Sequence, residues 1–257
     1  MTALATRRVV AGVPTVVIAA IAAAWVAALA AEATGAAARL HHDALAGIAV
    51  WAALPLFLVA WQAMVAAMML PSSLPLVRLF AAASAGQPRP NAALAGFLGG
   101  YAVVWSAFGA LAFAFDLGVH AAVHASPWLH AHEWLLGGSI LMLAGAFQFT
   151  ELKDACLDRC RHPAAFMLRF YERGTTGGLR LGARHGAYCV GCCWALMLVM
   201  FAAGVASLVW MALVTAVMVH EKTRPLGARA VPVTGLVLLA AGVTALLHSA
   251  SATGALG

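Results

Sequence analysis

The chain has 257 residues, of which 64% are hydrophobic and only 9% are charged, and its mean hydropathy is +0.92. A soluble domain keeps about a quarter of its residues charged. This composition therefore excludes a large aqueous domain and indicates that lipid is the main solvent. The net charge of +6 is accounted for by membrane topology and does not indicate nucleic-acid binding.

The apolar runs predict seven membrane helices, because a spanning helix needs roughly 20 apolar residues. The first follows Arg7 and Arg8, and the second ends at Pro71. The predicted helices cover residues 9–31, 44–70, 92–115, 134–149, 186–203, 206–220 and 231–248. The fold class is therefore an all-α, polytopic transmembrane bundle that forms one membrane domain over 1–257. An amphipathic loop that carries two cysteines is expected on the cytoplasmic side at 150–185.

The apolar stretch from Gly186 to His220 decides the topology. A single helix over its 35 residues would be about 52 Å long, which exceeds a hydrocarbon core of about 30 Å. A turn near Gly204 divides it into two helices. All Lys and Arg residues except Arg39 then face one side, as the positive-inside rule requires. We expect a bacterial inner-membrane protein with its amino terminus in the cytoplasm and its carboxyl terminus outside.

The first segment also has features of a secretory signal. Twin arginines precede an apolar run that contains Ala28-Leu29-Ala30, a small-residue pattern typical of cleavage sites. The run is longer than the usual h-region of about 7–15 residues, which favours a retained helix. Cleavage would leave six helices in the same orientation.

Five cysteines lie on the predicted cytoplasmic side. Thiols stay reduced there, so grouped cysteines indicate metal or redox sites rather than structural disulfides. Cys156 and Cys160 are four residues apart. They share one helix face if Thr150 caps a short helix that ends near Pro163.

The second group is Cys189, Cys192 and Cys193, at helical spacing in the first two turns of the predicted helix 186–203. The positive end of that helix, together with Lys153, favours the thiolate form that binds metals. Single buried cysteines are often ordinary small apolar residues, but two groups at one depth favour a site. Four thiolates suit zinc, copper(I) or an iron–sulfur cluster, and spacing does not choose between these.

Methionines cluster at the same predicted depth. Met64 and Met68 lie at the cytoplasmic end of the second helix, and Met197 lies one turn below the cysteines. Thioethers are soft ligands that suit copper(I), so the cluster favours copper as cofactor, with zinc and iron as alternatives. Methionine also packs irregular helix interfaces, which is the simpler explanation for any one of them.

Three polar residues are expected to support this site: Gln148, Lys153 and Glu221. Polar groups in membrane segments usually face the bundle interior. Glu221 is interpreted first as an interfacial partner of the adjacent Lys222.

Glycine and serine patterns give no sign of nucleotide or nucleophile chemistry. Gly99-Gly100 and Gly137-Gly138 lie in or beside membrane helices, where small residues allow close helix packing. Ser72 and Ser73 lie beside prolines and indicate a helix end.

A second candidate metal site lies on the predicted outer face. Asp116, His120 and His124 are spaced by four, so they share one face if the third helix continues that far. A carboxylate and two imidazoles resemble a facial triad for iron, copper or zinc, and His132 follows in the same loop. A solvated loop with incidental histidines explains the pattern equally well.

Four segments together resemble a bacterial family of unknown function, described as predicted metal-binding integral membrane proteins. They are WQAMVAAMMLPSSLPL (61–76), GAFQFTELKDACLDRCRHP (145–163), CVGCCWALM (189–197) and WMALVTAVMVHEK (210–222). The resemblance covers roughly residues 55–225. It implicates Met64, Met68, Met69, Gln148, Lys153, Cys156, Cys160, Cys189, Cys192, Cys193, Trp210, Met211 and Glu221. It departs at Ala206 and Ser207, where family members often have Met and Asn.

The leading hypothesis is a metal-binding membrane protein that handles copper at a cytoplasmic-end Cys/Met site. The alternative is a metal-dependent membrane oxidase, or a subunit of one, whose catalytic site is the outward Asp/His group. Thiol–disulfide chemistry with a quinone is disfavoured by the cytoplasmic placement, and a structural subunit stays open. Expected partners are the lipid bilayer, a metal ion, and further membrane subunits or a metal chaperone. Whether the protein is an enzyme is left undecided.

Overall fold

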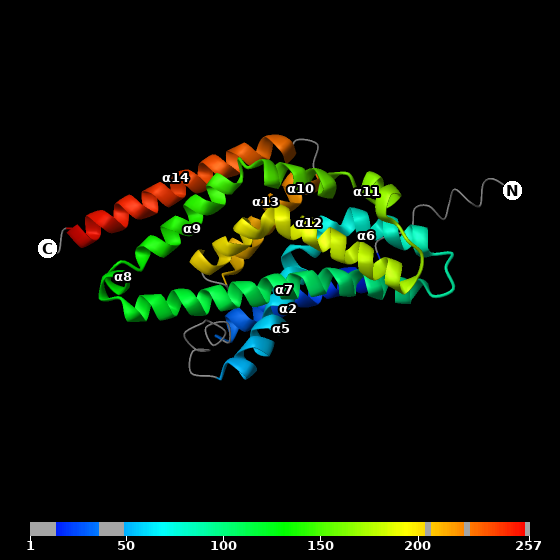
Figure 1. Ribbon diagram of the computed structural model, residues 1–257, viewed down its shortest axis with the longest axis horizontal. Coiled ribbons are helices and arrows are strands. Elements are labelled where there is room, and N and C mark those ends of the chain that lie inside the picture. Colours follow the sequence, from blue (N-terminus) through cyan, green and yellow to red (C-terminus); the bar gives the residue numbers. More distant parts are fainter. Residues whose placement is uncertain (1–13, 36–48, 204–206, 224–226, 255–257) are drawn as a thin grey trace.

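The computed structural model describes residues 14–35, 49–203, 207–223 and 227–254. These residues form eleven α-helices and no strand, which confirms the all-α class (Figure 1). The helices are α2 (Thr15–Ala33), α5 (Val50–Met68), α6 (Leu70–Ser84), α7 (Pro90–Ala125), α8 (Pro127–Ala131), α9 (Trp134–Phe147), α10 (Glu151–Arg161), α11 (Pro163–Phe170), α12 (Gly174–Ala203), α13 (Leu208–Thr223) and α14 (Gly227–Gly254).

Five of the described helices are long and apolar enough to cross a membrane: α2, α5, α7, α12 and α14. The pair α9–α10 is a sixth candidate, although it bends by 66° at its break. The predicted helix at 206–220 corresponds to α13, whose 16 residues make it only about 24 Å long. It is therefore shorter than a hydrocarbon core of about 30 Å.

Helix boundaries differ from the prediction mainly where polar residues continue a helix. The segment 150–185, expected to be a loop with one short helix after Thr150, consists of α10, α11 and the first turns of α12, which begins at Gly174. Helix α7 continues to Ala125, and α6 was not predicted. The predicted helix ends follow the limits of the apolar runs, whereas the observed helix ends follow the backbone hydrogen bonds. Residues 9–13, 44–48 and the turn near Gly204 lie outside the described residues.

Pro71 explains why the second apolar segment is divided into α5 and α6. Proline has no backbone N–H, so it cannot bond the carbonyl four residues earlier. That carbonyl belongs to Ala67, and the indole N–H of Trp25 donates to it instead at 3.1 Å. The break places Met69 between the helices, where the hydroxyls of Ser72 and Ser73 donate to its carbonyl at 2.8 and 3.2 Å.

Helix α12 lies at the centre of the fold and packs most extensively on α7. Glycines bring these backbones together. A Cβ on Gly100 would overlap the carbonyl oxygen of Leu179, and one on Gly182 would overlap that of Phe97. Such close approach by small residues is the usual way for apolar helices to associate. The packing role predicted for the two glycine pairs holds for their second members, since Gly99 and Gly137 face open space.

Helices α9, α10 and α13 also pack against α12. Helices α9 and α14 run side by side, and α10 lies across α12 (Figure 1). Helices α6 and α13 also contact each other. The cysteines, most buried methionines and both lysines of the chain lie on the elements that converge here.

Candidate metal centre

Three thiols project from successive turns of α12 into the protein interior. Cys189 is 0% exposed, and Cys192 and Cys193 are each 1% exposed. Residues three and four apart share a helix face, which is the face that packs inward here. The Sγ atoms of Cys192 and Cys193 lie 3.2 and 2.7 Å from the carbonyl oxygen of Cys189, to which they donate.

The predicted helix over Cys156 and Cys160 is present as α10. Its cap is Thr150, whose hydroxyl accepts from the backbone N–H of Lys153 at 3.3 Å. The α10 thiols reach α12 because Gly191 has no side chain, since a Cβ there would lie 2.6 Å from the Cys156 Sγ. Cys160 Sγ lies 4.0 Å from Cys192 Sγ, so the two cysteine groups meet.

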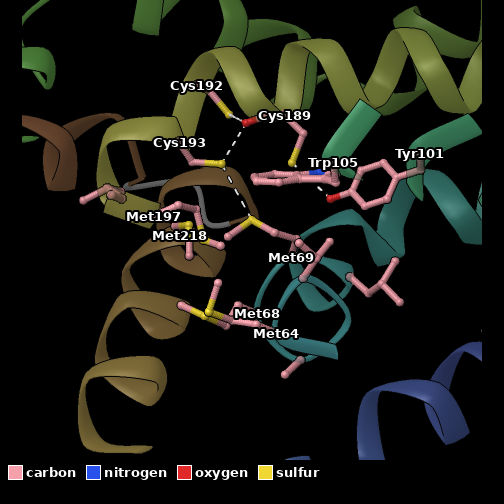
Figure 2. Close-up of a cluster of buried hydrophobic side chains, with 14 of the residues drawn as sticks. Met64, Met68, Met69, Tyr101, Trp105, Cys189, Cys192, Cys193, Met197 and Met218 are labelled. Carbon is pink, nitrogen blue, oxygen red and sulfur yellow. Dashed lines mark hydrogen bonds between the residues drawn. The ribbon is translucent and has the colours of Figure 1, made fainter. Parts of the chain in front are cut away.

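A second close contact between sulfurs joins a thiol of α12 to the thioether of Met69. Met69 is fully buried, and its Sδ lies 3.6 Å from Cys193 Sγ. Figure 2 shows Met69 between the thiols of α12 and the methionines of neighbouring helices. The neighbouring helices supply Met64 and Met68 from α5 and Met218 from α13, and Met197 comes from α12 itself; all four are buried. Met64, Met68 and Met197, predicted to lie near the cysteines, belong to the same core cluster as the thiols.

Polar side chains contact the same thiols. The ammonium of Lys222 lies 3.2 Å from Cys189 Sγ, 3.9 Å from Cys193 Sγ and 3.2 Å from the hydroxyl of Ser72. The Tyr101 hydroxyl lies 3.2 Å from Cys189 Sγ. These contacts place one positive charge and the Tyr101 hydroxyl directly beside the sulfurs.

The predicted source of thiolate stabilisation is wrong. Helix α12 begins at Gly174, so Cys189 lies near its middle rather than in its first turn. The helix-dipole effect falls off within the first turn and does not reach this sulfur. The cation beside the thiols is Lys222, not Lys153, because folding brings the end of α13 against α12.

Glu221 is paired differently from the prediction. Its carboxylate accepts from the ammonium of Lys153 at 2.7 Å, with both side chains almost completely buried. The Nε of Arg161 donates to the Glu221 carbonyl at 2.7 Å. Gln148 is also buried, and both polar atoms of its side chain have no partner in the described structure. Lys153 and Glu221 therefore join α10 to α13.

His185 and its neighbours were missed by sequence analysis. The ring of His185 is buried, stacks on Tyr101 at 5.6 Å and lies 3.0 Å from the hydroxyl of Ser73. Ser72 and Ser73 were interpreted only as a helix end, and Lys222 as a cytoplasmic charge and the interfacial partner of Glu221. The sequence did contain a signal for them, because Ser72 and Ser73 follow the methionines of the second segment and His185 precedes Cys189 by four residues.

The sulfurs are grouped in pairs and do not converge as four thiolates. Within the described residues, no three His, Cys, Asp or Glu side chains are placed to hold a metal ion together. A metal–thiolate bond is about 2.3 Å long, so two sulfurs sharing one ion lie at most about 4.6 Å apart. The Cys160–Cys192 and Cys193–Met69 contacts meet this limit. Soft thiolate and thioether donors of this kind select copper(I).

The acidic and histidine residues of the second candidate site are only partly brought together. Because α7 extends to Ala125, Asp116, His120 and His124 share one helix, and Asp116 Oδ1 lies 3.7 Å from His120 Nδ1. The rings of His124 and His130 are 6.5 Å apart. His132 instead stacks on Trp128 at 4.5 Å.

Oxidation is expected to link the two cysteine groups. Cys160 Sγ and Cys192 Sγ are 4.0 Å apart, so a small shift brings them to the disulfide length of about 2.05 Å. Mild oxidant applied to the metal-free protein should therefore produce a Cys160–Cys192 disulfide, detected by peptide mapping. Cys160→Ser should abolish this link. A dominant link from Cys156 to any α12 thiol would contradict the observed arrangement.

The features described define a class: an all-α protein with apolar, span-length helices around buried soft donors. The chain belongs to the PpoB2 family, described as copper chaperone, whose family model matches residues 58–245. All five cysteines and both lysines fall inside the match. The family supports a copper-related function and agrees with the metal-binding resemblance. No curated protein and no solved structure matches the chain.

Proposed function

We propose that the protein is an integral membrane copper-handling protein that binds copper(I) through buried thiolate and thioether sulfurs and passes it on. Copper is the cargo in this proposal. The single observation that carries it is the contact of 3.6 Å between Cys193 Sγ and Met69 Sδ, both excluded from solvent. Two different soft donors at one buried point suit copper(I) better than zinc.

The proposed location is the bacterial inner membrane, with the sulfur cluster toward the cytoplasm. The charge distribution of the sequence supports this orientation, and the apolar helices support membrane insertion. Helix α13 is the short, sixth crossing in this proposal, and it returns the chain to the cytoplasmic side, where Lys222 lies in its last turn. The bent pair α9–α10 enters the membrane and leaves its charged half at the cytoplasmic boundary.

The proposed ligands divide into a receiving set and a transfer set. Cys189, Cys193 and Met69 receive the ion, and Cys160 with Cys192 forms the pair from which it leaves. Cys156 and the methionines Met64, Met68 and Met197 surround these sets. The outward histidines collect the ion, so donor softness rises from imidazole to thioether to thiolate along its path. A metal chaperone or a further membrane subunit is the proposed recipient.

Copper(I) titration of the purified protein tests this function. Anaerobic competition with a coloured copper(I) chelator should give a stoichiometric complex for the natural chain. Cys193→Ser and Met69→Leu should each raise Kd at least about tenfold, because each loses a bond worth more than about 1.4 kcal/mol. Met142→Leu is the matched control, since Met142 packs against Gly242 on α14. Unchanged binding in both ligand variants would refute the proposed site.

The second candidate function is a metal-dependent membrane oxidase or a subunit of one, using iron, copper or zinc. It is favoured by Asp116 and His120, whose side chains approach to 3.7 Å on α7. In this case Asp116, His120, His124 and His132 supply the catalytic metal site, and the cysteines hold a separate ion. Loss of oxidase activity in Asp116→Asn with copper(I) binding at the thiols retained would favour this function.

A further inference from the structure

The two lysines of the chain are both buried, but their charges are balanced in different ways. Lys153 forms an ion pair with Glu221. Lys222 is 6% exposed, and in the described part of the chain its ammonium contacts a serine hydroxyl and two thiols but no carboxylate. An isolated buried cation is costly unless an anion compensates it. Among the described residues, the groups in direct contact that can supply that anion are Cys189 and Cys193.

A structural role alone does not account for this position. Lys222 lies in the last turn of α13, where a cation could simply interact with the negative end of the helix dipole. Its ammonium is instead directed across to Ser72 on α6 and to the sulfurs of α12. The positive charge of Lys222 therefore interacts with the sulfur site rather than with the end of its own helix.

We infer that Lys222 sets the charge of the ion that the site accepts, so that a monovalent soft ion is held and a divalent ion is rejected. This inference rests on the proposed function, in which Cys189, Cys193 and Met69 bind copper(I). It concerns only the choice between ions. Copper arrives and stays as copper(I), so no electron is transferred.

The sum of the charges at the buried site explains the preference for a monovalent ion. Two thiolates carry two negative charges, a neutral thioether adds none, and the protons of the thiols leave to solvent. One copper(I) ion and the Lys222 ammonium together supply two positive charges, so the loaded site is neutral. A zinc ion would leave one uncompensated positive charge, and a net charge in a low-dielectric interior is strongly disfavoured. Met69 adds to the same preference, because thioethers favour copper(I).

The test compares silver(I) with zinc(II) in the purified full-length chain. Silver(I) has the charge and softness of copper(I) and does not change oxidation state under assay conditions. Isothermal titration gives the affinity for each ion, and the natural chain should bind silver(I) more tightly than zinc(II). In Lys222→Met the ratio of the silver(I) affinity to the zinc(II) affinity should fall by at least about tenfold, because one positive charge beside the site is removed. Lys222→Arg keeps the charge and should keep most of the preference. Arg159→Met removes an exposed charge and should leave the preference unchanged.

Each outcome has a distinct meaning. If the ratio of silver(I) affinity to zinc(II) affinity is the same in the natural chain and in Lys222→Met, this inference is overturned, but the proposed copper binding is not. No silver(I) binding by the natural chain would instead overturn the proposed function itself. Lys222→Gln, which is neutral but still donates to Ser72, repeats the test if Lys222→Met does not yield folded protein. A ratio in Lys222→Gln equal to that of the natural chain would also overturn the inference.

Discussion

Replacing Glu221 with Gln is expected to destabilise the protein by about 3–5 kcal/mol. The carboxylate of Glu221 lies 2.7 Å from the ammonium of Lys153, and the two side chains are 2% and 0% exposed. Removing one partner of a buried ion pair leaves the other charge uncompensated, which is much more costly than losing an exposed pair. Thermal or denaturant unfolding in detergent, followed by circular dichroism, measures the change.

The matched control is Glu172→Gln. Glu172 pairs with Arg180 at 3.0 Å, but these side chains are 46% and 61% exposed. An exposed pair contributes less than about 1 kcal/mol, so this variant should unfold almost as the natural chain does. The double variant Lys153→Met/Glu221→Met should recover much of the lost stability, because it removes both buried charges. Equal effects of Glu221→Gln and Glu172→Gln would contradict the burial of the Lys153–Glu221 pair.

Replacing Gly100 with Ala is expected to destabilise the contact between α7 and α12 by about 3 kcal/mol or more. The added Cβ would overlap the carbonyl oxygen of Leu179 and would also crowd Ala183. These are backbone atoms of a helix, so they cannot rotate aside as a flexible side chain would. Separation of the helices would also move the thiols of α12, so copper(I) binding should weaken together with stability.

The neighbouring residue provides the control. Gly99 lies one position earlier on α7, and nothing lies within 4 Å of a Cβ added there. Ala is favoured over Gly in a helix by about 1 kcal/mol, so Gly99→Ala should be neutral or stabilising. Parallel thermal melts of the two variants measure the difference. Destabilisation of similar size in both variants would show that helix propensity, not close packing, governs these positions.

Most of the fold class could be predicted from the sequence because apolar runs of span length have few alternatives. Lipid cannot hydrogen-bond the backbone, so such segments must be helices. The helix end at Pro71 and the division of the stretch after Gly186 into two helices could also be predicted, the first from proline and the second from length and charge. The prediction failed at Gly174, where a polar beginning of α12 was interpreted as loop, and at α6, whose prolines were interpreted only as a stop.

The candidate site was predictable as a list of donors but not as an arrangement. Cys156 and Cys160 could be assigned to one helix face from their spacing and the cap at Thr150. Their contact with α12 could not, since it depends on the missing side chain of Gly191. The contact of Cys193 with Met69 likewise depends on residues 124 positions apart.

Sequence by itself determined an all-α protein, with span-length apolar helices and two groups of soft donors at helical spacing. These properties follow from local periodicity and composition, which act over a few helical turns. Tertiary structure alone decided which charges pair, joining Glu221 to Lys153 and leaving Lys222 to the thiols. Adjacent residues of a helix point in directions about 100° apart, so Glu221 and Lys222 face different neighbours. Only the packing of α10, α12 and α13 shows what those neighbours are.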